Sequence, residues 1–290
     1  MFVDQIKDRL KFFRNFLWFS EKRLSRSVKN KIANFQDGDD LSFTCNVCGK
    51  SVSAPIGMIS IRECRSCHEC GSTQRMRMVV HLLSMGLYGK SMATGCFPAT
   101  KKLGMGMSDT PSIAVRLGRK LNYTNTFYHR EPRLDITNLE PGVFGPLDFL
   151  ISSDVFEHIK PPLRPAFSNL YSLIKPGGFL VFSVPFDADA ETTVEHFPNL
   201  HDYVLELEKG VYVLRNTTAD CRQEEFTDLV FHGGPGQTLE MRVFSRKDLV
   251  SNLRSAGFKN IHFVSEEIPE IGIVTMPSTS RESPALIAWK

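Results

Sequence analysis

Seven cysteines occur in the sequence, and four of them are paired in a way that suits a metal ion. Cys45-Asn-Val-Cys48-Gly and Cys67-His-Glu-Cys70-Gly are two Cys-x-x-Cys-Gly motifs. A tetrahedral zinc ion needs four thiolates that converge from two directions, and a short tight turn delivers each pair. The glycine after each second cysteine permits the positive φ that such a turn can require. We therefore predict a zinc ribbon over residues 41–73, with Cys45, Cys48, Cys67 and Cys70 as the Zn²⁺ ligands.

Two alternatives to this ligand set are open. Cys64 precedes Cys67 closely and could replace one ligand, and the cysteines could instead form a loop of unliganded thiols. With four protein ligands the site would be closed, so the zinc would support folding rather than catalysis. Cysteines used in this way indicate a reducing compartment, and we expect a cytoplasmic protein. The sequence has no apolar run near the roughly 20 residues of a spanning helix and no signal-peptide pattern.

Positive charge is concentrated at the N-terminus. Residues 1–35 contain nine Lys or Arg and three Asp or Glu, whereas the net charge of the whole chain is only +3. Composition therefore does not favour nucleic acid as a partner. Within residues 1–40, apolar residues recur near helical spacing with Lys and Arg between them. This pattern predicts a basic amphipathic helix, which either packs on the main domain or rests on an anionic membrane surface or a protein partner.

Strand and helix patterns alternate after the cysteine motifs. The predicted helices span 74–85, 111–121 and a segment that begins at Pro162, and the predicted strands span 102–109, 123–128, 133–136, 147–153, 179–185, 260–264 and 285–289. This alternation is typical of a doubly wound α/β sheet, which binds ligands beyond the carboxyl ends of its strands. Residues 186–243 form an insertion beyond the strands and helices that the minimal fold needs, and their glycine-rich loops would suit a lid over a substrate.

Three motifs within this region resemble a known family. Asp154-Val-Phe-Glu-His158 follows a buried strand, Lys175-Pro-Gly-Gly178 opens the next strand, and Ser255-Ala-Gly-Phe258 follows the last helical pattern. Together they resemble the type-11 group of class I S-adenosylmethionine-dependent methyltransferases. The resemblance implies a Rossmann-like, mostly parallel seven-stranded sheet over residues 74–290, with a cap insertion at about 186–243. A zinc-knuckle module ahead of such a domain resembles one branch of that group, some of whose members sit among polysaccharide-assembly genes. Methyl transfer to a small-molecule or glycan-related acceptor is therefore the expected activity.

The resemblance places S-adenosylmethionine across the carboxyl ends of the strands. A glycine-rich first loop would let the backbone approach the cofactor, and Gly104 and Gly106 are the candidates for it. Ser108 and Asp109 could bond the amino-acid end or the ribose. The full Asp-x-Gly-x-Gly-x-Gly pattern of the family is absent, and the remaining pair could equally be an ordinary strand-to-helix turn. The pair also lacks the third glycine and the later acid of a dinucleotide-dependent oxidoreductase.

Four further cofactor candidates follow from the family's motif positions. The second strand of the family ends in an acid that accepts bonds from both ribose hydroxyls, and here Glu131 is a displaced candidate for that role. Asp135 and Ile136 match the position that holds the adenine amino group. Ser153 would line the methyl-transfer side.

The catalytic candidates are His158, Asp154 and His196. Methyl transfer is an in-line displacement that positioning accelerates, and a base assists when the acceptor is a hydroxyl. His158 and Asp154 are candidates through their motif, although His158 could instead only brace the next segment. His196 lies in the insertion with His201 and His232, where surface histidines without a role are equally plausible. A metal ion on His196 and His201 would still need a third ligand.

A different class of function also fits the sequence. The degenerate glycine pattern would suit a catalytically inactive, methyltransferase-like protein that serves as a zinc-stabilised binding or scaffold module. Binding of S-adenosylmethionine separates this alternative from the enzyme.

Overall fold

The computed structural model describes residues 40–140, 142, 144–233, 236–264, 266–274 and 284–290. Apart from Asp40, the predicted basic helix at residues 1–40 lies outside these described residues. Among the helices described, none is long and apolar enough to cross a membrane.

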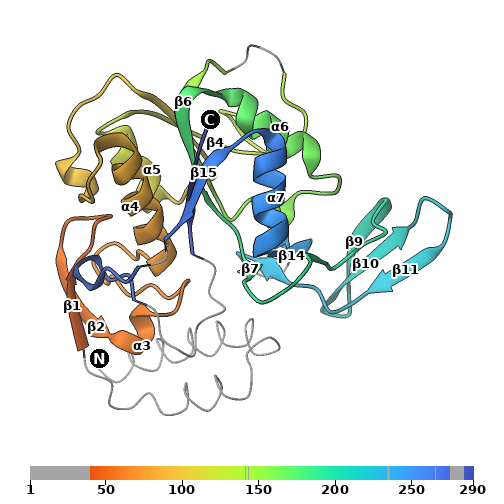
Figure 1. Ribbon diagram of the computed structural model, residues 1–290. Helices are drawn as coiled ribbons and strands as arrows, with labels where there is room; N and C mark the ends of the chain where they lie inside the picture. The colour runs from red at the N-terminus through yellow and green to blue at the C-terminus, as the bar shows by residue number, and fades with distance from the viewer. Residues whose placement is uncertain (1–39, 141, 143, 234–235, 265, 275–283) are drawn as a thin grey trace.

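The alternating patterns form one central sheet of six strands (Figure 1). Across the sheet, the strands are β15 (Lys259–Phe263), β16 (Leu286–Trp289), β6 (Ile174–Ser183), β5 (Leu147–Ser153), β3 (Leu103–Met107) and β4 (Asn122–Thr126). The last four are parallel to one another, and β16 and β15 add antiparallel strands at one edge. The expected α/β fold with a mostly parallel central sheet is confirmed.

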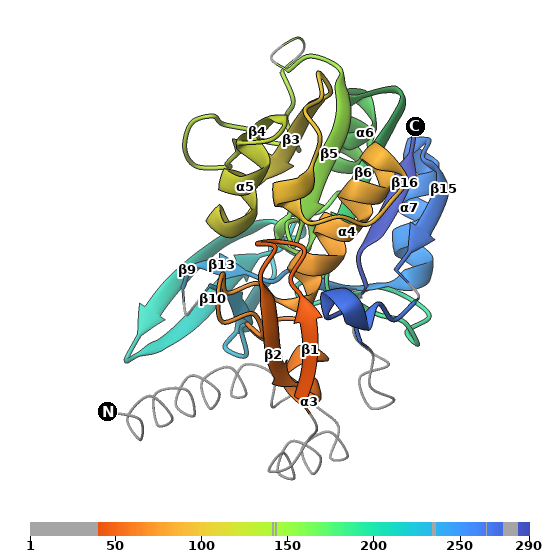
Figure 2. The ribbon, with the colours of Figure 1, turned by 90° about the vertical axis from the view of Figure 1, so that its left-hand side faces the viewer.

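Helices cover both faces of this sheet (Figures 1 and 2). They are α4 (Gln74–Tyr88) and α5 (Pro111–Gly118) on one face, and α6 (Arg164–Leu173) and α7 (Arg246–Ala256) on the other. The side chains of β5 alternate between the two layers: Phe149 and Ile151 pack in the core beneath α4 and α5, and Leu150 packs with α6 and α7. A strand buried on both faces reads as a continuous apolar run, which explains the sequence pattern.

Local signals fix the ends of the longer helices. Thr73 begins α4, because its hydroxyl accepts a hydrogen bond from the Met76 amide, and Gly89 ends it with φ at 69°. Ser245 likewise accepts from the Asp248 amide at the start of α7, and Gly257 ends that helix with φ at 113°. These are the N-cap and C-cap chemistries that satisfy the unpaired backbone groups of a helix.

The prediction of seven strands is wrong for the part of the chain that the structure describes. Residues 133–136 make one parallel bridge, between Phe127 and Arg133, and no strand. Pro132 has no amide hydrogen to donate, and the Arg133 amide is taken by the Glu131 carboxylate at 2.9 Å. Asp135 then accepts from the Thr137 amide, which turns the chain away from the sheet.

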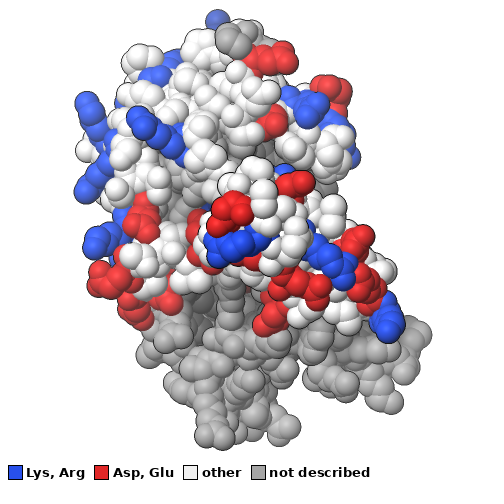
Figure 3. Space-filling view, turned by 90° about the vertical axis from the view of Figure 1, so that its right-hand side faces the viewer, with Lys and Arg blue, Asp and Glu red and all other residues white. Residues whose placement is uncertain are grey.

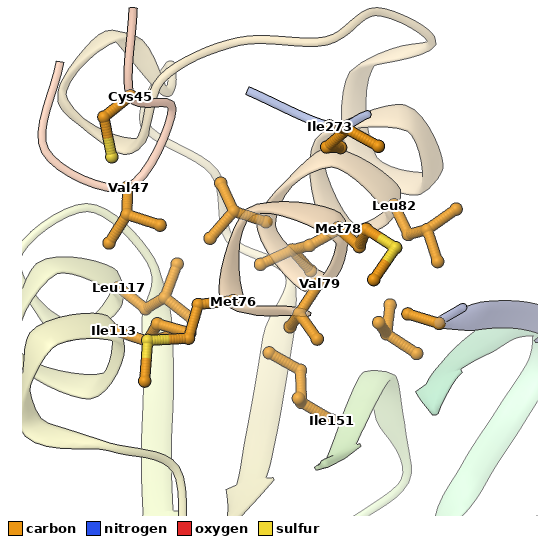
Figure 4. Close-up of a cluster of buried hydrophobic side chains, with 14 of the residues drawn as sticks. Cys45, Val47, Met76, Met78, Val79, Leu82, Ile113, Leu117, Ile151 and Ile273 are labelled. Carbon is orange, nitrogen blue, oxygen red and sulfur yellow. The ribbon is translucent and has the colours of Figure 1, made fainter. Parts of the chain in front are cut away.

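The N-terminal module, residues 40–73, packs into the same core as the sheet. It consists of the antiparallel hairpin of β1 (Asp40–Thr44) and β2 (Ser51–Pro55), the short helix α3 (Ile56–Ile59) and two cysteine turns. Figure 4 shows Cys45 and Val47 facing the side of α4, with Ile113 and Leu117 of α5 and Ile151 of β5 nearby. The 3₁₀ turn η1 (Thr94–Cys96) adds a bond from the Thr94 hydroxyl to the Val47 carbonyl.

Arg77 of α4 joins this module to the C-terminal part of the chain. Its guanidinium is fully buried and donates to the Ser72 carbonyl, the Ser66 hydroxyl and the Gly272 carbonyl. Gly272 follows the 3₁₀ turn η3 (Pro269–Ile271), which contacts β1. Burial lowers the pKa of Arg77 from its ordinary value, and the surrounding cysteines act in the opposite direction.

The insertion at residues 186–243 forms a separate layer that projects from the body in Figure 1. Its three-stranded antiparallel meander consists of β9 (Asp202–Glu208), β10 (Val211–Thr217) and β11 (Gln223–Phe226). Short strands connect it to the sheet: β7 (Phe186–Asp187), β8 (Val194–Glu195), β12 (Phe231–His232), β13 (Thr238–Leu239) and β14 (Arg242–Ser245). A small core of Phe197, Leu214, Phe231, Leu239 and Met241 stabilises it. On the face drawn in Figure 3, acidic and basic side chains are interspersed.

Candidate functional site

The loop after β3 is held by the neighbouring strand β4. The Ser108 amide donates to the Thr126 carbonyl at 2.8 Å, and Ser108 itself is exposed with φ at 58°. Asn125 accepts from the Asp109 amide and donates to the Asp109 carbonyl, both at 2.9 Å. The loop of Ser108, Asp109 and Thr110 is therefore a rigid turn at the carboxyl end of the sheet, where such folds bind ligands.

Gly104 and Gly106 lie inside β3 rather than in this loop. A Cβ atom on Gly104 would come within 1.9 Å of the Phe149 ring. A Cβ atom on Gly106 would come within 1.9 Å of Tyr123 Oη and 2.2 Å of Asp109 Oδ2. Both positions require glycine, and the space over them is filled by this chain's own side chains.

Tyr123 and Asp109 form a buried hydrogen bond beside Gly106. Tyr123 Oη donates to Asp109 Oδ2 at 2.5 Å. Burial raises the pKa of Asp109 to about 7, and the bond from Tyr123 offsets part of that rise. Asp109 can thus change its charge near neutral pH, unlike an exposed aspartate.

The remaining cofactor candidates lie on the segment after β4. Glu131 is exposed and accepts from the Arg133 amide. Asp135 accepts from both the amide and the hydroxyl of Thr137, at 2.9 and 2.6 Å. Ile136 is buried, and its carbonyl accepts from Asn169 of α6 at 2.8 Å.

The carboxyl end of β5 is bound to the N-terminal module by an ion-pair network, the Arg62–Asp154 network (Arg62, Glu63, Arg75 and Asp154). Arg62 donates to both carboxylate oxygens of Asp154, at 2.9 and 2.6 Å, and Arg75 Nε lies 3.0 Å from Oδ2. Glu63 pairs with both arginines, at 2.6 and 2.7 Å. Arg75 of α4 also donates to the Ser153 hydroxyl at 2.6 Å, so Asp154 contacts the module and Ser153 contacts the helix that follows it.

This network determines the charge of Asp154. Burial would raise the pKa of its carboxyl, but Arg62 and Arg75 outweigh that effect and hold the pKa well below its ordinary value. Asp154 also adopts φ of 53°, and its Oδ1 accepts from the Ser183 hydroxyl at 3.1 Å. A carboxylate that accepts this many bonds is a weak base, and its geometry suits a positioning role.

Beyond Asp154, five side chains form an imidazole–carboxylate cluster (Glu157, His158, His196, His232 and Glu240). Glu157 Oε1 lies 3.6 Å from His158 Nε2 and 3.4 Å from His232 Nδ1. The nitrogens His232 Nε2 and His196 Nε2 lie 3.0 and 2.8 Å from the two oxygens of Glu240. The candidate catalytic residues His158 and His196 are thus brought into one cluster, and His232 belongs to it as well.

Arg242 fixes the 3₁₀ turn η2 (Phe156–His158), which carries Glu157 and His158 of the cluster. It is fully buried and donates to the carbonyls of Phe156 and Ile159 at 2.9 and 2.5 Å. Its Nε donates to Glu195 at 2.7 Å. The segment after β5 is therefore held at two points, by Arg62 of the N-terminal module at Asp154 and by Arg242 of the insertion at η2.

Four further residues belong to the site without having been predicted from the sequence: Arg62, Arg75, Glu157 and Glu240. Glu157 lies inside the Asp-x-x-Glu-His motif and could have been found there. The two arginines and Glu240 carry no local signal, since they meet the site only through contacts between distant parts of the chain.

The four predicted metal ligands converge, and Cys64 lies outside their group. The Sγ–Sγ distance is 3.8 Å for Cys45 and Cys70, 3.8 Å for Cys48 and Cys67, and 3.6 Å for Cys67 and Cys70. Zinc–sulfur bonds of about 2.3 Å in a tetrahedron place the sulfurs about 3.8 Å apart. The thiols therefore have the spacing of a tetrahedral metal site and are too far apart for disulfides.

The comparisons with known proteins add the family. No curated protein matches the chain. One solved structure similar to it is an S-adenosylmethionine-dependent methyltransferase from Clostridium acetobutylicum, with 11% identity, a TM-score of 0.42, and coverage of 74% of this chain and 90% of that one.

Two further similar structures are methyltransferases with named substrates. The 1,6-didemethyltoxoflavin-N1-methyltransferase of Burkholderia thailandensis has 14% identity, a TM-score of 0.40, and coverage of 74% and 78%. The sugar N-methyltransferase KedS8 of Streptoalloteichus has 11% identity, a TM-score of 0.40, and coverage of 73% and 85%.

A family model described as a methyltransferase domain matches residues 113–263, which run from α5 to the end of β15. The matched residues include the carboxyl ends of β4, β5 and β6, Asp154 and the whole imidazole–carboxylate cluster. The chain belongs to the methyltransferase domain family.

Proposed function

We propose that this protein is an S-adenosylmethionine-dependent methyltransferase that acts on a small-molecule or glycan-related acceptor. The observation that carries the proposal is the methyltransferase family match over residues 113–263, on a sheet whose carboxyl edge gathers polar side chains. The surroundings of Ser108 and Asp135 at that edge support it, because hydrogen bonds hold both polar residues in place, Ser108 against β4 and Asp135 against Thr137.

The proposed cofactor site runs along the carboxyl ends of β3, β4 and β5. Its members are Ser108, Asp109, Glu131, Asp135, Ile136 and Ser153. Gly104 and Gly106 would act indirectly: their missing side chains make room for Phe149 and Tyr123, which set the position of Asp109. Bound S-adenosylmethionine would supply a methyl group on a positively charged sulfur.

The chain's own groups would then position the acceptor and receive its proton. The methyl group would pass to the acceptor atom, and the electrons of the broken carbon–sulfur bond would remain on sulfur. His158 Nε2 is the proposed proton acceptor, because the Leu239 carbonyl at 2.8 Å keeps the proton on Nδ1. Asp154 would hold Arg62 and Arg75 in place, and His196 would act through Glu240.

We also propose that Cys45, Cys48, Cys67 and Cys70 hold a structural zinc ion. The sulfur spacing supports this, as does the position of the cysteine turns in a shared core beside α4. Four thiolate ligands leave no open position, so the metal would stabilise the module rather than react. Through Arg62, the same module would keep Asp154 in its ionised form.

One observation favours a second function, a methyltransferase-like binding or scaffold protein. Phe149, Tyr123 and Asp109 fill the space over the glycines that would admit a cofactor in the family's loop. A chain that had lost cofactor binding could use this space for its own packing.

Calorimetric titration of the zinc-loaded full chain with S-adenosylmethionine and S-adenosylhomocysteine tests the proposal. We expect saturable binding of both ligands that is weakened in Asp135→Ala. Asp202→Ala is the matched control, because it removes an exposed carboxylate of the meander, outside the proposed cofactor site. No binding of either ligand to a folded chain at millimolar concentration would reject the enzyme and favour the scaffold.

A further inference from the structure

We propose that Glu157, His158 and His232 form a second metal site, which takes a divalent transition-metal ion. One carboxylate oxygen and two imidazole nitrogens of these residues all lie within 4.8 Å of one another. Two of the separations, 3.6 Å from Glu157 Oε1 to His158 Nε2 and 3.4 Å to His232 Nδ1, are close to a tetrahedral edge. Metal–nitrogen and metal–oxygen bonds of about 2.0–2.2 Å give edges of about 3.3–3.6 Å.

The two imidazoles are already oriented as metal ligands. His158 donates its Nδ1 hydrogen to the Leu239 carbonyl at 2.8 Å, which leaves the Nε2 lone pair facing Glu157. His232 Nε2 lies 3.0 Å from a Glu240 oxygen, and in the tautomer that donates this hydrogen the Nδ1 lone pair faces Glu157 Oε1. Metal-binding histidines characteristically direct their second nitrogen to a backbone carbonyl or a carboxylate, because that bond fixes the tautomer and the ring orientation.

Glu157 supplies an independent observation. Its side chain has no exposed surface, and neither carboxylate oxygen has a hydrogen-bond donor among the described residues. A buried carboxylate without such partners is costly unless a cation compensates it. Since the Arg62–Asp154 network already uses Arg62 and Arg75, the charge that compensates Glu157 comes from its two imidazoles, either as a proton on His232 or as a metal ion held between them.

Ligand chemistry selects the class of metal. Two imidazoles and one carboxylate suit zinc, ferrous iron or cobalt better than calcium or magnesium, which prefer oxygen ligands. Three protein ligands leave at least one open position, and His232 is about one-third exposed, so solvent or a ligand can reach the ion. The site adjoins the segment after β5, where the open position could bind an oxygen atom of the acceptor. With the ion bound, His158 Nε2 is a ligand and no longer a base, and the metal would instead lower the pKa of an acceptor hydroxyl at the open position. That last role rests on the proposed function, whereas metal binding itself does not.

Binding of cobalt to the full chain tests the site. Protein that carries one zinc per chain at its cysteines is titrated with Co²⁺ and followed by visible absorption and calorimetry. We expect one further equivalent, with the spectrum of nitrogen and oxygen ligands and without thiolate charge-transfer bands. Those bands would indicate exchange at the cysteine site. Failure to bind a second equivalent, in a chain that keeps its zinc, would overturn the proposal whatever the outcome of cofactor titration.

Variants assign the ligands. Glu157→Gln and His232→Asn, each in a chain that retains its cysteine zinc, should lose the second equivalent. Glu240→Gln should weaken it by roughly 10–100-fold, as is usual for a residue that orients a ligand. His201→Asn is the matched control, because His201 is an exposed histidine of the same insertion outside the cluster. Unchanged cobalt binding in His232→Asn and Glu157→Gln would reject the assignment.

Discussion

Arg62 and Asp154 lie 92 residues apart in sequence and meet in a two-bond ion pair, with nitrogen–oxygen distances of 2.9 and 2.6 Å. The pair joins the N-terminal module to the carboxyl end of β5, the strand at the centre of the proposed site. Because both side chains are mostly buried, each compensates the charge of the other. The module is thus part of the candidate site and not only an appendage to it.

Loss of the carboxylate should destabilise the whole chain. Asp154→Asn leaves Arg62 and Arg75 buried with reduced compensation, and removal of one partner of a buried pair costs about 3–5 kcal/mol. Arg62→Lys should cost less, because it keeps the charge and loses the two-bond geometry. Urea unfolding measures the loss of unfolding free energy in both variants, provided that the dependence of this free energy on urea concentration is unchanged. Lys247→Ala is the control: its pair with Glu191 is exposed, so a change above about 0.5 kcal/mol there would undermine the comparison.

Loss of a zinc ligand should unfold the N-terminal module. Cys67→Ser removes one of the four converging thiolates, and we expect loss of bound zinc together with faster amide exchange in β1 and β2. Exchange should also rise near Gly272, because Arg77 bonds both the module and that carbonyl. Cys96→Ser is the control, since Cys96 is exposed and outside the group. Equal zinc content in the two variants would contradict the four-cysteine site.

Local patterns predicted the elements better than the contacts between them. The strand at 147–153 and the start of the helix at 74 coincide with β5 and α4, because an apolar run and a Thr N-cap are local signals. The seventh strand was predicted wrongly, since a single bridge at Arg133 replaces it. Two neighbours prevent a strand at residues 133–136: Pro132 has no amide hydrogen, and the Glu131 carboxylate takes the Arg133 amide. A pattern of alternating apolar residues does not reveal either of these effects.

The candidate site was predictable only in part. The four cysteines converge as their spacing predicted, and His158 and His196 share a cluster. The partners of Asp154 were not predictable, because an ion pair across 92 residues has no local pattern. Gly104 and Gly106 were assigned to a loop that approaches a cofactor, yet their strand positions admit Phe149 and Tyr123 instead. Glycine in a sequence shows that something lies close to the backbone and does not show what it is.

Asp109 should make stability fall as the pH rises from about 4 to about 7. Its folded-state pKa of about 7 lies above the 3.8 of an ordinary aspartate, so the folded chain binds its proton more tightly. The resulting stabilisation is complete below pH 4 and is lost as the pH rises to about 7. Asp109→Asn, whose carbonyl can still accept from Tyr123, should be more stable than the parent at pH 8 and lose this dependence. Urea unfolding at pH 5 and pH 8 measures the unfolding free energy of the variant and of the parent. An equal difference between the two chains at both pH values would contradict the raised pKa.

Gly106 and Tyr123 should be energetically coupled. In Gly106→Ala the new methyl group would lie 1.9 Å from Tyr123 Oη and 2.2 Å from Asp109 Oδ2, so the bond between these side chains must break. Tyr123→Phe removes the same bond, and the double variant should therefore be destabilised by less than the sum of the single changes. Gly118→Ala is the control, because nothing lies within 4 Å of a Cβ atom there, and alanine at that helical position should be neutral or stabilising by up to about 1 kcal/mol. Denaturant unfolding of the parent, the two single variants and the double variant gives the coupling energy between Gly106 and Tyr123. Additivity within about 0.5 kcal/mol would mean that Gly106 is required for some other reason, such as the approach of a cofactor to the backbone.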